Sequence, residues 1–268
     1  MAIDVTAITV SQAALSLLFG TMIGLLLGLV GGGGSILTVP ILVYVIGLDI
    51  RAATATSLAI VGTSALAGTI PHARAGRVNG HVALFFGLVG IAGAFAGTWL
   101  NHLVAGAWIL LLFGVLMLVV AVRMWLRKAP RLPARPGEDD PGAIWKVGIA
   151  GLVVGVLTGF FGVGGGFLIV PALALALGMP MAMAVGTSLL IIAINSASGI
   201  VAHQGTGGVD LPVALFFIVG GLVGGLVGGR LAGTIDERAL SRAFSAIVAG
   251  IGLYLIVQNA VVVVGGLA

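Results

Sequence analysis

The feature that most constrains this chain is a series of long apolar stretches with charged residues only in the loops or near their ends. Four stretches in each half are long enough, at roughly 17–25 residues, to cross a bilayer as helices. They cover about 11–30, 52–70, 82–100 and 108–125, then 147–163, 182–201, 212–232 and 239–258. Because the stretches are continuous rather than alternating, the sequence predicts an all-α polytopic membrane protein and not a transmembrane barrel.

Composition excludes several classes of function. Charged residues make up 7% of the 268 residues, whereas a soluble domain carries about 25% to solvate its surface. A soluble enzyme is therefore excluded, and the twelve basic residues form no stripe that would follow a nucleic acid. The chain has no cysteine, and no His, Asp and Glu cluster has metal-ligand spacing. We expect no nucleic-acid partner, no cofactor, no metal and no catalytic residue.

The two halves of the chain are copies of each other. An offset of 131 residues aligns them without a gap. The aligned pairs include Gly24 and Gly155, Pro40 and Pro171, Thr56 and Thr187, His72 and His203, and Phe86 and Phe217. We predict a first transmembrane repeat over 1–125, a polar cytoplasmic linker over 126–146 and a second repeat over 147–268. Internal repeats of this size are typical of secondary transporters.

The basic residues indicate that the two repeats are inverted. Arg74 follows the second long stretch of the first copy, where the second copy has Gly205. Arg230 lies at the end of the second copy's third long stretch, where the first copy has Trp99. Cytoplasmic loops collect Lys and Arg, so the copies are expected to face opposite sides of the membrane.

Inversion requires an odd number of crossings in each copy. A short apolar stretch, at about 35–47 or 167–178, supplies the fifth segment of each repeat. Ten crossings then place both termini outside the cytoplasm and leave only Arg51 on the wrong side. If the short stretches are re-entrant, there are eight crossings. A helix of about 13 residues reaches only about 20 Å, so the crossing would need an extended glycine run to complete it.

Each short stretch follows a glycine cluster that predicts a broken helix. The run Gly31–Gly34 costs about 1 kcal/mol per glycine within a helix. Pro40 suits the first turn of a new helix, which Ser35 or Thr38 could cap. The second copy repeats the plan with Gly162, Gly164, Gly165 and Gly166 ahead of Pro171.

A helix break inside the membrane suits an anion. The new helix presents free N–H groups and a partial positive charge, and glycine permits close approach. Irregular backbone survives at this depth only where it is buried in protein or lines a cavity. The candidate substrate-binding residues are Gly32, Gly33, Gly34, Ser35, Thr56, Ser57, Gly164, Gly165, Gly166, Thr187, Ser188 and Asn195. The alternatives are that the glycines only allow helix packing, the hydroxyls only cap the next helix, and Asn195 only contacts another helix.

His72 and His203 lie at the end of the second long stretch of each repeat and are candidates for gating or proton coupling, since histidine changes charge near neutral pH. The alternative is an interfacial histidine bound to a backbone carbonyl. No charged residue lies in the middle of a stretch, although cation transporters commonly keep carboxylates there. A small polar anion is the solute that fits.

Three duplicated motifs carry a resemblance to a known family. They are the glycine cluster running into a proline, the segment from Ala53 to Leu58 repeated from Ala184 to Leu189, and the Gly-x3-His-x3-Gly-x-Val run at Gly68 and Gly199. In this order they resemble the sulfite exporter TauE/SafE family over about residues 11–258. The resemblance implies a plasma-membrane permease for sulfite, sulfoacetate, or related sulfonates or organic acids, driven by an ion gradient rather than ATP.

The expected function is therefore secondary-active transport of a small sulfur-containing anion by alternating access. The partners are the anionic solute, the lipid bilayer, and coupled protons or another ion. An anion channel and a non-transporting assembly or sensor subunit are the alternatives. Substrate, direction of transport, coupling ion and oligomeric state stay open.

Overall fold

The computed structural model describes residues 9–101, 103, 106–126, 143–161, 166–202 and 209–265. These ranges are almost entirely helical and contain no strand, which confirms the all-α prediction. The helices are α1 (Val10–Val30), α2 (Gly33–Tyr44), α3 (Ile50–Arg74), α4 (Gly80–Asn101), α5 (Gly106–Trp125), α6 (Ala143–Phe161), α7 (Gly166–Pro171), the π-helix η2 (Ala172–Ala176), α8 (Met181–Ala202), α9 (Leu211–Leu231) and α10 (Glu237–Gly265).

Eight of the described helices are long and apolar enough to cross a membrane. Large apolar side chains stay exposed on their outer faces, including Leu18, Phe95 and Trp145, which are 63%, 72% and 74% exposed. A soluble protein does not leave so many such side chains in water, whereas lipid accepts them. The remaining two segments, α2 and the continuous pair α7 and η2, are shorter apolar helices.

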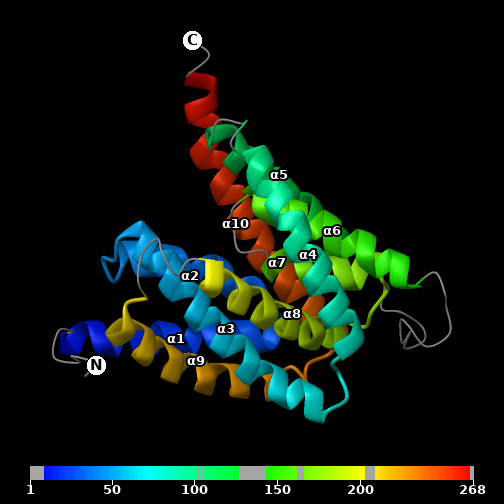
Figure 1. Ribbon diagram of the computed structural model, residues 1–268, viewed down its shortest axis with the longest axis horizontal. Coiled ribbons are helices and arrows are strands. Elements are labelled where there is room, and N and C mark those ends of the chain that lie inside the picture. The colour runs from blue at the N-terminus through cyan, green and yellow to red at the C-terminus, as the bar shows by residue number, and fades with distance from the viewer. Residues whose placement is uncertain are drawn as a thin grey trace.

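The first helix of each repeat packs against the fourth helix of the other. Figure 1 shows α1 beside α9, and α4 beside α6. A methyl group on Gly24 would overlap the backbone of Gly221, and one on Gly155 would overlap the backbone of Gly90. Both members of the second contact are 131 residues from their equivalents in the first. The two backbone contacts are therefore reciprocal, and only glycine permits them.

The other long helices pack across the two repeats as well. Helix α3 crosses α8, where Gly62 faces Ser196, and α5 packs on α10, where Gly114 faces Gly252. Many of the main helix contacts therefore join residues 9–126 to residues 143–265, so the predicted repeats interlock rather than form separate units. This reciprocity agrees with inversion, which stays a prediction.

Among the residues that the structure describes, most of the arginines gather at one end of the helices, which we call the basic end. The Arg77 guanidinium, just after α3, packs on Gly233, just after α9. The Ser241 hydroxyl, near the start of α10, donates to the Met124 carbonyl at the end of α5, and Arg242 lies 5.6 Å from the centre of the Trp125 ring. The basic end carries Arg74, Arg77, Arg123, Arg230, Arg238 and Arg242.

The glycine break differs in detail from its prediction. Helix α1 ends at Val30, and Gly31 has φ +79°, a left-handed conformation that favours glycine. Helix α2 then begins at once at Gly33, so no extended run follows the break. Pro40 lies inside α2 and not in its first turn. The predicted capping by Ser35 or Thr38 is wrong, because both lie inside the helix and their hydroxyls donate to the Gly32 and Gly34 carbonyls.

Candidate functional site

The starts of the two short helices meet inside the protein. A methyl group on Gly32 would overlap the backbone of Gly166, and one on Gly166 would lie 2.6 Å from the Ser35 hydroxyl oxygen. Gly34 is equally close to α1, at 2.6 Å from the Ile23 carbonyl oxygen. Gly32 of the first glycine cluster therefore lies against Gly166 of the second. Gly164 and Gly165 lie outside the described residues.

The two threonines of the predicted site are structural hydrogen-bond acceptors. Thr187 Oγ1 accepts the backbone N–H of Asn79 at 3.1 Å, and Thr56 Oγ1 accepts that of Asp210 at 3.0 Å. Asn79 and Asp210 precede α4 and α9, and each side chain accepts a backbone N–H three residues later. Thr187 thus holds the start of α4, and Thr56 holds the start of α9, each in the other repeat. This contact goes beyond the local capping that the sequence suggested.

The hydroxyls of the two serines next to these threonines also form hydrogen bonds within the protein. The Ser57 hydroxyl donates to the Thr54 carbonyl at 2.8 Å, and the Ser188 hydroxyl donates to the Val185 carbonyl at 2.7 Å. Ser188 additionally lies beside the break, 2.7 Å from a methyl group placed on Gly31. Because each hydroxyl proton is already donated to a backbone carbonyl, neither serine can donate a hydrogen bond to an anion in this conformation.

Asn195 is the predicted residue that faces open space. It lies in the middle of α8 and lines a cavity of about 420 Å³ between α4, α6 and α8. Its side-chain oxygen has no hydrogen-bond partner in the described part of the chain. The polar side chains around the cavity are Thr98, Thr158, Asn195, Ser196 and Ser198, and its other walls are glycine and apolar residues. Hydroxyl and amide groups line it, and no charged group does.

Sequence reasoning missed two members of this wall. Thr98 and Thr158 each stand alone in a long apolar helix, and their equivalents in the other repeat are Gly229 and Leu27. The difference between the two copies could have indicated these threonines, because a polar side chain that appears in only one repeat is not needed by the shared fold.

The equivalent region of the other half is closed. Ser64, the counterpart of Asn195, is fully buried, and its hydroxyl fills the space where a side chain on Gly221 would stand. A methyl group on Gly68 would lie 3.6 Å from the Gly225 carbonyl oxygen. On the cavity side, a methyl group on Gly90, the counterpart of Gly221, would meet only the Gly151 carbonyl oxygen. The equivalent helix pairs therefore differ: α3 and α9 pack closely here, whereas α4 and α8 touch at Gly87 and diverge around the cavity.

His72 is buried within the closed half. Its Nε2 lies 3.0 Å from the Gly28 carbonyl oxygen, and because a carbonyl only accepts, Nε2 carries the proton. Nδ1 has no partner among the described residues. The ring also lies against the backbone positions of Gly186 and Gly229. The sequence also allowed a histidine bound to a backbone carbonyl as the alternative to gating, and His72 makes such a hydrogen bond, although it is buried rather than interfacial. His203 lies outside the described residues.

Comparison with known proteins agrees with this architecture. The profile of the family described as sulfite exporter TauE/SafE matches residues 16–255. A probable membrane transporter protein of Xylella fastidiosa (strain 9a5c) is 38% identical over 92% of this chain and 96% of its own length. A second, YunE of Bacillus subtilis (strain 168), is 31% identical over 75% of this chain and 81% of its own length. A probable membrane transporter protein of Methanocaldococcus jannaschii is 24% identical over 90% of this chain and 94% of its own length. No solved structure matches significantly.

The apolar helices define an integral, multi-pass membrane protein, and the comparisons support membrane transport rather than enzymatic activity. The chain belongs to the sulfite exporter TauE/SafE family.

Proposed function

We propose that this chain is a secondary-active transporter that carries a small sulfur-containing anion across the plasma membrane by alternating access. Sulfite, sulfoacetate, and related sulfonates or organic acids are the proposed substrates. Membership in a family described as sulfite exporters supports the substrate class. The absence of charged groups from the middle of the described spans argues against a cation as the solute.

The asymmetry between the two halves is the observation that carries the mechanism. A chain with reciprocal contacts has two equivalent ways to pair its helices. Here α4 and α8 diverge around the cavity, while α3 and α9 pack closely. Exchange of these two arrangements would close the cavity at Asn195 and open one at Ser64. The solute would then face the opposite side of the membrane, which is the essence of alternating access.

The distribution of charge suggests which way the cavity faces. The cavity uses the parts of α4, α6 and α8 that lie away from the basic end. If the basic end is cytoplasmic, as the positive-inside rule favours, the repeats are inverted, both termini lie outside and the linker lies inside. The conformation described is then open to the outside.

Neutral hydrogen-bond donors would bind the anion in the cavity. The Asn195 amide can give two N–H groups, and the hydroxyls of Thr158 and Ser198 stand in the same wall. A cavity of about 420 Å³ lies within the usual range for small-molecule sites. Because Gly32 packs directly on Gly166, the paired helix starts can contact the anion only if they separate during the exchange.

Transport by the purified protein in proteoliposomes tests this proposal. We expect saturable uptake of radiolabelled sulfite or a sulfonate, faster with a proton gradient, and faster again when unlabelled substrate is preloaded inside. Acceleration by preloading distinguishes a carrier from an anion channel. Absence of uptake for sulfur oxyanions, sulfonates and carboxylates, together with no thermal stabilisation by any of them, would reject transport in favour of a non-transporting subunit.

A further inference from the structure

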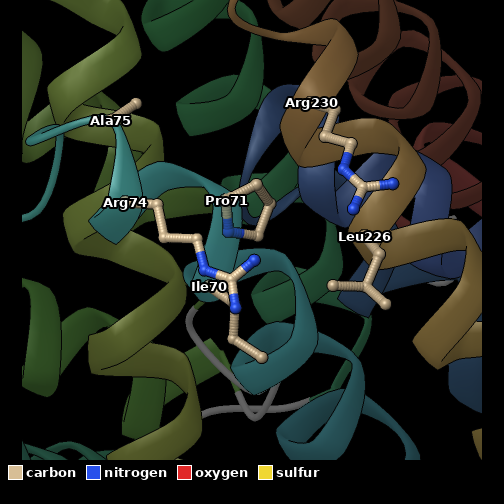
Figure 2. A pocket seen from close by; sticks show the side chains of 6 residues that line it. All are labelled: Ile70, Pro71, Arg74, Ala75, Leu226 and Arg230. Carbon is tan, nitrogen blue, oxygen red and sulfur yellow. The ribbon is translucent and has the colours of Figure 1, made fainter.

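A second polar site lies at the basic end, away from the cavity at Asn195. A groove of about 290 Å³ is lined by residues at the C-terminal ends of α3 and α9. Figure 2 shows the side chains of Arg74 and Arg230 extending into this groove from its two sides. Ile70, Pro71, Ala75 and Leu226 complete the lining.

The two arginines of the groove have no acidic counterpart there. No carboxylate lines the groove, and among the described ranges no ion pair joins either guanidinium to an Asp or Glu. Two like charges that share a groove of low polarity repel each other, and an anion placed between them removes that repulsion. A guanidinium presents paired N–H groups that match the oxygens of sulfate or phosphate groups.

The shared fold of the repeats does not require these arginines. The residue equivalent to Arg74 in the second repeat is Gly205, and the residue equivalent to Arg230 in the first repeat is Trp99. The pair is therefore a feature of one end of the molecule only. Arg238 and Arg242, by contrast, belong to α10 and do not line the groove.

The groove adjoins the closed interface between α3 and α9. A methyl group on Gly229 would lie 2.5 Å from Cγ of Pro71, and Arg230 follows Gly229 directly. An anion held by both guanidinia would therefore link the two helices whose contact closes this half of the molecule. Separation of α3 from α9 would divide the site and release the anion, so binding and closure favour each other.

We propose that Arg74 and Arg230 form a binding site for a tetrahedral oxyanion group, and that its occupancy stabilises the closed contact between α3 and α9. Free inorganic sulfate and the phosphate of an anionic lipid headgroup share this chemistry. Binding here requires neither the cavity at Asn195 nor any transport activity, so the site stands if the proposed function fails.

Thermal unfolding of the purified full chain in neutral detergent tests the site. Sodium sulfate is titrated against sodium chloride at matched ionic strength, and phosphatidylglycerol is titrated separately into nanodiscs of neutral lipid. We expect at least one ligand to raise the Tm of the parent chain. Arg74→Gln and Arg230→Gln should each weaken that response about tenfold, as loss of a charge-assisted contact does. Arg238→Gln removes the same charge from the same end and should leave it unchanged.

The pattern of responses identifies the source of the oxyanion. A response to sulfate identifies a free anion, and a response to phosphatidylglycerol alone identifies a lipid headgroup. No response to either, or an equal loss in Arg238→Gln, would overturn the site. If a glutamine variant fails to fold, Arg74→Lys keeps the charge but loses the paired donors. Weakened binding in that variant supports the site, and unchanged binding argues against it.

Discussion

Thr56 Oγ1 accepts the backbone N–H of Asp210 at 3.0 Å, although the two residues belong to opposite repeats. The hydrogen bond from Asn79 to Thr187 is its equivalent, at 3.1 Å. Both threonines are fully buried, so neither hydroxyl can exchange its partner for water. These two bonds fix the start of α9 against α3 and the start of α4 against α8.

Replacing either threonine should therefore lower stability rather than substrate affinity. Thr56→Val and Thr187→Val keep the side-chain volume but leave a partly buried N–H without its acceptor, which costs up to about 1–3 kcal/mol. Thermal unfolding in detergent should show a lower Tm for both variants, with the apparent Kd for substrate unchanged. Thr63→Val is the matched control, because its hydroxyl bonds only carbonyls of its own helix. A normal Tm with weakened substrate binding would instead make these threonines ligands.

Asn195→Leu should abolish transport without preventing folding. The substitution replaces the amide donors in the cavity wall with an apolar group of similar size, and an anion loses its hydrogen bonds there. Uptake into proteoliposomes measures transport, and size-exclusion chromatography checks folding. Ser64→Ala removes a hydroxyl at the equivalent position in the closed half and should have a smaller effect on uptake. Wild-type uptake by Asn195→Leu would place the substrate elsewhere.

The glycine contacts between α4 and α6 predict a large difference between two Gly→Ala variants. The added methyl group of Gly155→Ala overlaps the backbone of Gly90, and overpacking of this kind costs about 1–3 kcal/mol. Gly250 lies in α10 with nothing within 4 Å of an added methyl group, so Gly250→Ala should be neutral or slightly stabilising. The measurement is the Tm of each variant, and equal values would refute the close approach of α4 and α6.

The absence of cysteine makes the open and closed halves directly testable. Ser198 lines the cavity, whereas Ser64 is fully buried. A membrane-impermeant maleimide added outside intact cells should label Ser198→Cys and leave Ser64→Cys unlabelled. Labelling of Ser198→Cys only from the cytoplasmic side would reverse the proposed orientation. Equal labelling of both variants would contradict the asymmetry.

His72→Gln tests proton coupling. Glutamine can still donate to the Gly28 carbonyl but cannot gain a proton at the position of the unpartnered Nδ1. If His72 carries the coupled proton, uptake by this variant should no longer accelerate when a proton gradient is applied. His81→Gln is a control at the start of α4, which should keep the acceleration. An unchanged response in His72→Gln would assign coupling to another group.

The sequence predicted the helices well, because apolar length and glycine content are local properties. The predicted stretch 212–232 became Leu211–Leu231, and the break fell in the predicted cluster, at Gly31. The start of α2 was misplaced because Pro40 is tolerated inside this helix, where α2 packs on other helices. The orientation of Thr56 and Thr187 depends on helices of the opposite repeat, which no local pattern reveals. Arg74 and Arg230 indicated topology, but their shared groove depends on how α3 meets α9.

The pairing of α1 with α9 has a consequence for how the chain is made. Helix α1 is synthesised first, yet the glycine face that it presents fits a helix near the end of the chain. During translation its polar backbone groups along that face must therefore remain against lipid or other temporary neighbours. A chain truncated before Leu211 would therefore leave the oldest segment of the protein without its partner, and exposed surface of this kind favours misassembly.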